Sequence, residues 1–433
     1  MSEHFAVAVV GGGQAGLSMS WHLRSNGVDH VVFERDRVGH EWRERRWDSF
    51  CLVTPNWQCR LPGYAYGGDD PDGFMSGVEV VTFLEKYAAG FDPPLREGVA
   101  VHRLRRRVGG MFELVTSAGM VTADQVVVAT GPYHRPAVPR LAERLPERIV
   151  QLHSSQYRNP DQLPEGAVLV VGTGQSGCQI AEDLHLAGRA VHLAVGGAPR
   201  AARRYRGRDT LAWLEEMGHY DKGIDEFADA DAVRLRANHY MTGRDGGRDI
   251  DLRRFAVEGM RLYGRLKGID AARATFADDL AVNLDGADAV AEGIKDAIDA
   301  YIVRAGLDAP DEARYVPMWR PPAVHADELR LEDVAAVVWG TGFHRDHRWI
   351  EVPVFDGRGY PTHDRGVTSC PGLYFLGLPW QHTWGSGRFA GVARDAAHLA
   401  VQITAARRRQ VTEGVSWLAG TPTETYPDLE WAA

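Results

Sequence analysis

Two glycine-rich segments carry the residue types and spacing best suited to hold a phosphorylated cofactor. The first has the pattern G-x-G-x-x-G at Gly11, Gly13 and Gly16, directly after an apolar run at residues 5–10. The first glycine permits a tight turn, the second lets the backbone approach a pyrophosphate, and the third lets a helix pack on the strand. The following helix offers free N–H groups and the positive end of its dipole to the phosphates. This segment therefore predicts a dinucleotide site.

An acidic residue completes the first unit. A second apolar run at residues 30–33 ends on Glu34. A carboxylate at the end of the second strand can accept hydrogen bonds from ribose hydroxyls. Strand, glycine loop, helix, strand and acid occur here in order, which is far more specific than a glycine pattern alone.

The same arrangement returns near the middle of the chain. An apolar run at residues 167–171 leads into Gly172, Gly174 and Gly177, and a helix and a second strand follow. The roles of the three glycines are the same as in the first unit. The chain therefore contains two dinucleotide-binding units of one design.

The end of the second unit differs from that of the first. No carboxylate follows its second strand, and arginines crowd the next positions instead: Arg200, Arg203, Arg204 and Arg206. An acid would repel a 2′-phosphate, whereas arginines can bind one in bidentate fashion. The segment favours NADPH over NADH, with a solvated basic loop as the alternative interpretation.

Several further features resemble the flavin-containing monooxygenase superfamily, which includes microbial amine monooxygenases, plant auxin-forming enzymes and Baeyer–Villiger enzymes. Two apolar runs end in near-identical turns at Thr130-Gly131 and Thr341-Gly342, where the superfamily's chain crosses between domains. Residues 153–160 are similar to its linker motif, although Glu147 and Ile149 replace the usual Phe-x-Gly. His153 would help position a nicotinamide or serve as a packing residue.

The resemblance implies an α/β fold with two Rossmann-like dinucleotide-binding domains, the NADPH domain inserted in the FAD domain. We expect residues 1–155 to form the first part of the FAD domain. Residues 156–329 would form the NADPH domain with a helical insertion, because residues 205–310 are polar, Ala-rich and helical in pattern. Residues 330–433 would complete the FAD domain.

The resemblance also names candidate site residues beyond the two loops. Thr130, Thr341 and Gly342 would contact the cofactors from the crossing turns. Gly391 would begin the last helix, whose dipole can stabilise negative charge on the flavin pyrimidine. Asn56 would donate a hydrogen bond near flavin N5, or would be an ordinary turn asparagine.

A loop just before that helix is the second candidate for a catalytic role. Residues 377–389 combine two tryptophans, a histidine and Arg388 with four glycines and serines that break regular structure. We expect a flavin or substrate role for this loop. In a Baeyer–Villiger reaction, Arg388 would be the cation beside a deprotonated peroxide.

The implied function is an NADPH-dependent flavin monooxygenase. A C4a-hydroperoxyflavin would transfer one oxygen atom from O2 to a small organic substrate, at nitrogen or sulfur. Such nucleophiles need no activating base, which suits a sequence with no obvious catalytic pair. The alternatives are a Baeyer–Villiger monooxygenase, or a flavin-dependent NADPH reductase or oxidase without oxygen transfer.

Composition limits the remaining classes. A net charge of −9 argues against a general nucleic-acid surface. The four cysteines show neither a C-x-x-C pair nor metal-ligand spacing, which disfavours a disulfide reductase and predicts no metal. No apolar run reaches the length of a membrane span. We expect a cytoplasmic enzyme with a small-molecule substrate, no nucleic-acid or membrane partner, and a homodimer left open.

Overall fold

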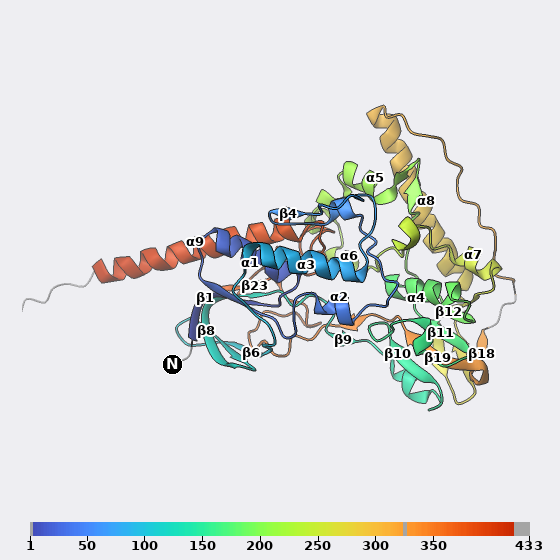
Figure 1. Ribbon diagram of the computed structural model, residues 1–433, viewed down its shortest axis with the longest axis horizontal. Coiled ribbons are helices and arrows are strands. Elements are labelled where there is room, and N and C mark those ends of the chain that lie inside the picture. Colours follow the sequence, from blue (N-terminus) through green and yellow to red (C-terminus); the bar gives the residue numbers. More distant parts are fainter. Residues whose placement is uncertain (1–2, 324–326, 420–433) are drawn as a thin grey trace, which may run out of the picture.

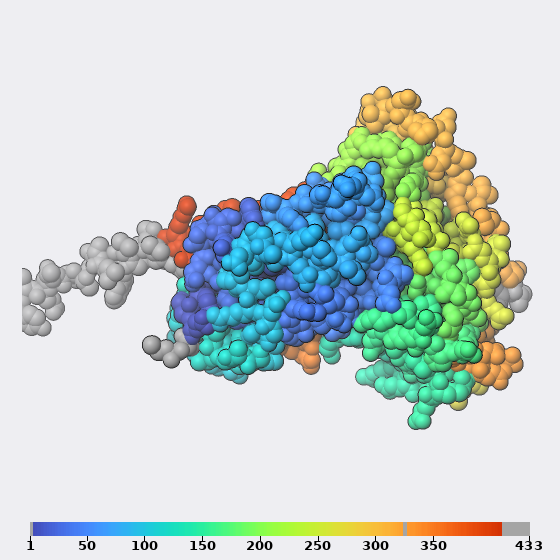
Figure 2. Space-filling model, viewed as in Figure 1, coloured from blue at the N-terminus to red at the C-terminus, as the bar shows by residue number. Residues whose placement is uncertain are grey.

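The computed structural model describes residues 3–323 and 327–419. Two lobes, each built around a sheet, lie side by side, and helix α9 (Val392–Ala419) extends away from the first lobe (Figure 1). The N-terminal residues, in blue, lie directly against green and yellow residues of the second lobe (Figure 2). The two lobes therefore share a boundary.

The first lobe contains a nine-stranded sheet with β1 (Glu3–Val10) at its centre. β1 runs parallel to β2 (His30–Phe33) on one side and to β8 (Gly119–Val128) on the other. The other strands of this sheet are β5 (Leu95–Arg96), β6 (Val101–Arg106), β7 (Phe112–Thr116), β21 (His363–Asp364), β22 (Val367–Thr368) and β23 (Leu373–Phe375).

Both faces of β1 are buried, which explains its unbroken apolar sequence. Val7 and Val9 belong to a core cluster with Leu17 of helix α1 (Gln14–Ser25) and with residues of α9. Ala8 and Val10 point the other way, into a cluster formed with β6 and β7. Helices thus cover one face of the sheet, and an antiparallel extension covers the opposite face.

Shorter elements complete the first lobe. Helix α3 (Gly77–Phe91) begins with a capping box, in which Ser76 and Glu79 satisfy each other's backbone N–H groups. The remaining elements are α2 (His40–Glu44), the β3 (Arg60–Leu61) and β4 (Tyr64–Ala65) hairpin, and the 3-10 helix η1 (Asn56–Gln58). The 3-10 helix η2 (Arg140–Arg144) packs in the core of the second lobe.

The second lobe contains a five-stranded, wholly parallel sheet in the order β10-β19-β11-β12-β15. Helix α4 (Gln175–Leu186) follows the second glycine loop, as predicted. The strands are β10 (Val150–His153), β11 (Ala167–Val171), β12 (Val191–Ala194), β15 (Arg261–Tyr263) and β19 (Val334–Trp339). The predicted α/β class with two Rossmann-like units is confirmed.

The strand pairing places both domain boundaries at other positions than the sequence predicts. β10 and β19 lie in the second sheet, whereas boundaries at 155 and 330 assign both strands to the first domain. β10 is a short edge strand of alternating character, so its sequence carries no strong signal. The chain crosses between the sheets after β8 and again after β19. There β9 (Arg135–Pro136) pairs antiparallel with β20 (Phe343–His344), so the two crossing segments form one ribbon.

The predicted helical insertion is present between β12 and β19. Its longest element, α8 (Leu280–Ala305), stands at the outer edge of the second lobe (Figure 1). The other elements are β13 (Arg204–Tyr205), β14 (Arg208–Asp209), α5 (Thr210–Glu216), α6 (Ala230–Leu235), α7 (Leu252–Val257), and a three-stranded sheet of β16 (Leu266–Ile269), β17 (Arg273–Phe276) and β18 (Glu328–Arg330).

A matched pair of glycine substitutions tests this packing. A Cβ on Gly16 would lie 1.8 Å from the carbonyl oxygen of Gly11, whereas a Cβ on Gly90 of α3 would enter open space. Gly16→Ala should lower the thermal midpoint strongly, and Gly90→Ala should leave it unchanged or raise it, since alanine favours a helix by roughly 0.5–1 kcal/mol. Equal midpoints for the two variants in a calorimetric scan would contradict the packing.

Candidate active site

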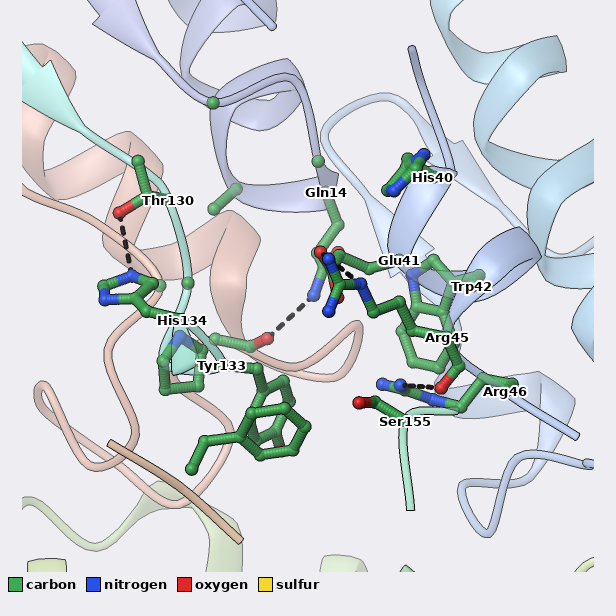
Figure 3. Close-up of a pocket in the computed structure, with 18 of the residues that line it drawn as sticks. Gln14, His40, Glu41, Trp42, Arg45, Arg46, Thr130, Tyr133, His134 and Ser155 are labelled. Atoms are coloured by element: carbon green, nitrogen blue, oxygen red, sulfur yellow. Dashed lines mark hydrogen bonds and ion pairs between the residues drawn. The ribbon is translucent and has the colours of Figure 1, made fainter. Parts of the chain in front are cut away.

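A single cavity of about 1080 Å³ follows the carboxyl ends of the strands in both sheets. This is where ligands bind in open α/β sheets. The first glycine loop, the second glycine loop and both crossing segments contribute to its wall. Figure 3 shows Gln14 of the first loop and Tyr133 of a crossing segment directed toward the cavity, together with Arg45 and Arg46 from the end of helix α2. The volume exceeds the usual range for a single drug-sized ligand.

Close backbone contacts shape the first glycine loop. Gly11 has φ +110°, and a Cβ on it would lie 2.5 Å from the carbonyl oxygen of Ala129. Gly13 differs, because a Cβ there meets nothing within 4 Å. Gly13 is the N-cap of α1, so the open space lies at the end of the helix where an anion is stabilised. The loop therefore fits a pyrophosphate.

Glu34 is held against this loop at the end of β2. One carboxylate oxygen accepts a hydrogen bond from the backbone N–H of Gly12 at 2.6 Å, and the other accepts from Asp36 N–H at 3.0 Å. Glu34 also lines the cavity. The position and fixed orientation of the carboxylate agree with the predicted contact to a ribose.

The second glycine loop repeats this geometry. Gly172 has φ +101°, and a Cβ on it would lie 2.8 Å from the carbonyl oxygen of Gly340. A Cβ on Gly177 would lie 2.0 Å from the carbonyl oxygen of Gly172. Gly174 again meets open space at the N-cap of its helix. The second loop therefore fits the same kind of ligand.

The crossing turns lie between the two loops. Thr130 and Gly342 line the cavity, whereas the Thr341 hydroxyl donates to the carbonyl of Ala137 at 2.5 Å and does not line it. His153 Nε2 donates to the carbonyl of Gly342 at 2.8 Å, and its ring packs edge-on against Phe343. Burial lowers the pKa of His153. These contacts favour a packing role for His153.

The arginines after β12 are engaged within the protein. Arg200 Nε donates to Asp288 at 2.5 Å and Arg203 Nη2 donates to Asp209 at 2.6 Å, and both arginines are buried. Arg204 donates to the carbonyls of Gly246 and Gly247. The structure thus contradicts the predicted 2′-phosphate contact at Arg200 and Arg203, because carboxylates distant in sequence already neutralise them. Only Arg204 lacks a carboxylate partner.

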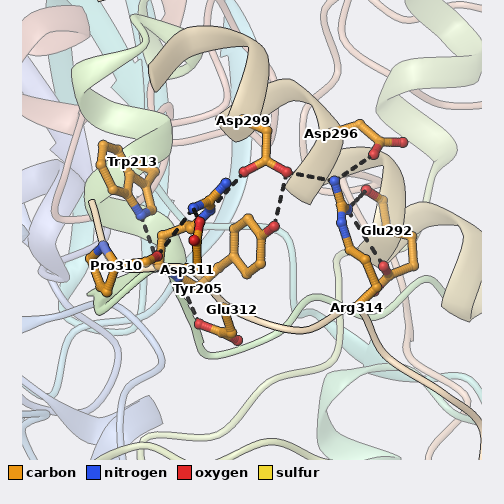
Figure 4. Close-up of polar contacts among 10 residues, drawn as sticks. Tyr205, Trp213, Glu292, Asp296, Asp299, Pro310, Asp311, Glu312 and Arg314 are labelled. Atoms are coloured by element: carbon orange, nitrogen blue, oxygen red, sulfur yellow. Dashed lines mark hydrogen bonds and ion pairs between the residues drawn. The ribbon is translucent and has the colours of Figure 1, made fainter. Parts of the chain in front are cut away.

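Arg206 belongs to a separate polar cluster on the insertion. Its guanidinium pairs with Asp299 and Asp311. Asp299 also accepts from the hydroxyl of Tyr205 and from Arg314, which connects α8 to the segment that follows it (Figure 4). This cluster holds the insertion together and does not line the cavity.

Asn56 does not face the cavity. Its side chain is buried in η1, where Nδ2 donates to the carbonyl of Asp70 at 2.9 Å and Oδ1 accepts from Met75 N–H at 2.8 Å. Thr54, two residues earlier, lines the cavity instead. The structure contradicts the predicted flavin contact and supports the alternative, a turn asparagine, because the backbone uses both ends of the amide.

Arg388 does line the cavity, as does Arg46, which the sequence did not single out. The Arg46 guanidinium lies over the rings of Trp42, Phe50 and Tyr133, at 5.0, 5.6 and 5.9 Å from their centroids. Burial lowers the pKa of both arginines. Residues 43–46 contain three arginines, of which Arg46 is the last, so the sequence around it resembles a solvated basic segment.

The start of the last helix sits behind this cavity. Gly391 packs against Gly385, and a Cβ on Gly391 would lie 2.6 Å from the Gly385 carbonyl carbon. Gln14 of the first loop donates to the carbonyl of Gly387 at 3.1 Å. Gly391 therefore shapes the loop, and Ser386 to Phe389 form the cavity wall.

The cysteines offer no redox pair. All four are free, and Cys59 and Cys178 are buried. Burial raises the pKa of Cys59 to about 12 and that of Cys178 well above its usual value. Of the four cysteines, Cys51 alone lines the cavity, and burial raises its pKa as well. Thiol–disulfide chemistry is therefore disfavoured.

The described residues contain neither a group of three or more His, Cys, Asp or Glu that could hold a metal ion, nor a helix long and apolar enough to cross a membrane. The cytoplasmic location and the homodimer remain predictions.

Three comparisons place this geometry among known proteins. The family model for pyridine nucleotide-disulphide oxidoreductases matches residues 8–217. An uncharacterized CzcO-like oxidoreductase of Geobacillus kaustophilus is 33% identical over 91% of this chain and 96% of its own length. The flavin-containing monooxygenase of Stenotrophomonas maltophilia has a similar fold, with a TM-score of 0.64 and 20% identity over 93% of this chain and 99% of that one.

A second solved structure is an ornithine N-hydroxylase from Kutzneria sp. 744, described with reduced FAD, NADP⁺ and L-ornithine. Its TM-score is 0.60 at 17% identity, covering 94% of this chain and all of that one. At these identities the two structures establish a shared fold.

The ion pair of Arg200 predicts a stability effect in place of a cofactor effect. Arg200→Gln should lower the free energy of unfolding by about 2–4 kcal/mol, because it leaves the Asp288 carboxylate less compensated. The ratio of KM values for NADPH and NADH should change less than about twofold. Arg204→Gln is the matched control, with little loss of stability in urea. A tenfold change of the ratio in Arg200→Gln without loss of stability would contradict this assignment.

Asn56→Ala should also act through stability. It leaves a buried N–H and a carbonyl without partners, at a cost of roughly 1–3 kcal/mol in the free energy of unfolding. Because Asn56 does not line the cavity, the fraction of NADPH electrons released as hydrogen peroxide should stay as in the unmodified protein. An increase of that fraction in a correctly folded variant would restore a flavin role.

Proposed function

Because this chain belongs to the family of CzcO-like oxidoreductases, we propose that it is an FAD-dependent monooxygenase that uses NADPH as reductant. The observation that carries the proposal is the opening of two equivalent glycine loops onto one cavity. A protein that binds only one dinucleotide has no use for the second loop. Two proteins of similar fold, a flavin-containing monooxygenase and an N-hydroxylase described with FAD and NADP⁺, support the same function.

The first unit would hold FAD. The N–H groups at the start of α1 would bind the pyrophosphate beside Gly13, and the Glu34 carboxylate would accept hydrogen bonds from the adenosine ribose. The second unit would hold NADPH in the same manner, with its pyrophosphate beside Gly174. When bound, FAD would supply the redox chemistry, with NADPH as the two-electron reductant and O2 as the oxidant, so that one oxygen atom enters the substrate and the other leaves as water.

The protein's own contribution is to orient the reactants and exclude water. Trp42 and Phe389 stack with centroids 6.0 Å apart, and Trp42 also packs on Phe50. All three line the cavity. An apolar wall of this kind protects a reactive oxygen species from hydrolysis and loss of peroxide. We propose nitrogen or sulfur as the oxygenated atom, since neither needs a base.

Baeyer–Villiger oxidation of a ketone is the second candidate. The Arg388 cation in the cavity wall favours it, because such a reaction uses a negatively charged oxygen donor. Product analysis with a thioether, a tertiary amine and a cyclic ketone separates the two candidates.

Mixing the reduced, FAD-loaded protein with oxygen and NADP⁺ tests the proposal. We expect a transient absorbance distinct from that of oxidised FAD, and one atom of isotopically labelled O2 in the product. Reoxidation without a transient, with every NADPH equivalent recovered as hydrogen peroxide for all three substrates, would contradict oxygen transfer.

Two equivalent substitutions test the cofactor assignment. Gly13 and Gly174 both have negative φ values, and a Cβ on either meets no atom within 4 Å, so valine should not disturb the fold. Gly13→Val should yield colourless protein, because the side chain fills the pyrophosphate position. Gly174→Val should keep FAD but be reduced by NADPH at least about tenfold more slowly. Full FAD occupancy in Gly13→Val would overturn the assignment of the first unit.

A further inference from the structure

Arg388 is a cation at the mouth of the cavity with no acidic partner. Its Nη2 donates to Oδ1 of Asn238 at 2.8 Å, and its Nη1 donates to the carbonyl of Trp384. The guanidinium lies 4.0 Å from the centroid of the Trp384 ring. No ion pair joins Arg388 to any acid in residues 3–323 or 327–419. An arginine stays charged at every physiological pH, so this charge is left for a ligand.

The surroundings of Arg388 hold it in place. Trp384 stacks on Tyr220 of the insertion, with centroids 4.4 Å apart and planes 28° apart. Ile224 N–H donates to the carbonyl of His382 at 2.6 Å, which ties the same loop to the insertion. The guanidinium is therefore fixed between two segments far apart in sequence. A guanidinium whose N–H groups are held in this way loses little conformational entropy when it binds a planar anion.

The acids that line the cavity are already occupied. Glu34 accepts from the first loop, Glu41 pairs with Arg45, and Asp346 pairs with Arg348. Asp36 pairs with Arg35. None of them competes for Arg388. Partial removal of a cation from water is costly unless an anion compensates it, and the lowered pKa of Arg388 reflects that cost.

The position of Arg388 separates it from the cofactor phosphates. Each glycine loop supplies N–H groups of its own for a pyrophosphate. The backbone at Gly387 contacts Gln14 of the first loop, whereas the Arg388 side chain contacts the exposed Asn238 of the insertion. Arg46, another cavity-lining arginine with no ion pair among the described residues, lies beside Ser155 of the crossing segment instead (Figure 3). A ligand at Arg388 would thus enter from solvent next to the proposed flavin.

We propose that Arg388 and Asn238 form a subsite for a carboxylate, and that the substrate is an organic acid whose reacting atom extends inward from this anchor. This inference rests on the proposed monooxygenase function. The carboxylate would accept from the guanidinium, and the Asn238 amide group would donate a second hydrogen bond. Anchoring at the mouth leaves the apolar wall to hold the rest of the molecule.

Binding to the oxidised, FAD-loaded protein tests the subsite without any turnover. The probes are 4-(methylthio)benzoate and its neutral amide, which have the same shape and differ in charge. Titration calorimetry should give the carboxylate at least about tenfold tighter binding than the amide. Arg388→Gln should remove that preference and leave amide binding within about twofold. Arg388→Lys should keep part of it, because the charge remains but the bidentate fork is lost.

Arg236→Gln is the matched control. Arg236 is exposed, lies two residues from Asn238 and does not line the cavity, so its loss removes the same charge without touching the subsite. It should leave both affinities unchanged. The proposal is overturned if the unmodified protein shows no preference for the carboxylate, including no binding of either probe, or if Arg388→Gln weakens both probes equally while FAD content and melting temperature are normal. Because no NADPH or oxygen is used, carboxylate binding without oxygen transfer would refute only the proposed function.

Discussion

The close approach of backbone to backbone at the two glycine loops is the constraint on which this structure depends. Gly11 lies against Ala129, and Gly172 lies against Gly340, so each loop is packed directly on the turn at which the chain leaves its sheet. A side chain on Gly11 or Gly172 would push that turn away. With only hydrogen atoms there, the helix N-termini, the crossing turns and the strand ends converge on one cavity. The position of both proposed cofactors follows from this contact.

The insertion and the C-terminal loop depend on one another in turn. Tyr220 and Trp384 stack across the boundary, and Arg394 of α9 donates to the carbonyl of Tyr220 at 3.1 Å. The insertion thus reaches from the outer edge of the second lobe to the wall of the cavity. A change in the insertion would alter the shape of the substrate end without disturbing the glycine loops. Under the proposed function, cofactor binding would in this way be separate from substrate choice.

The parts of the fold and site that depend on neighbouring residues along the chain could be predicted from the sequence. Gly11 to Gly16, Glu34 and the second loop follow from the order of strand, loop and helix, and the α/β class follows from them. The role of Arg200 could not be predicted from its neighbours in sequence, because its ion-pair partner Asp288 lies on the distant helix α8. The role of Asn56 could not be predicted either, because its side-chain amide bonds to the backbone of Asp70 and Met75, which lie 14 and 19 residues further along the chain. β10 was missed because a short edge strand has little apolar pattern.

If both dinucleotides meet in the one cavity, NADPH must be able to reduce the bound FAD. Anaerobic mixing of NADPH with the FAD-loaded protein measures this reduction directly. We expect the visible absorbance of oxidised FAD to be lost in a single fast phase, with one NADPH consumed for each flavin reduced. Tight binding of FAD together with a flavin that stays oxidised under excess NADPH and under excess NADH would contradict it.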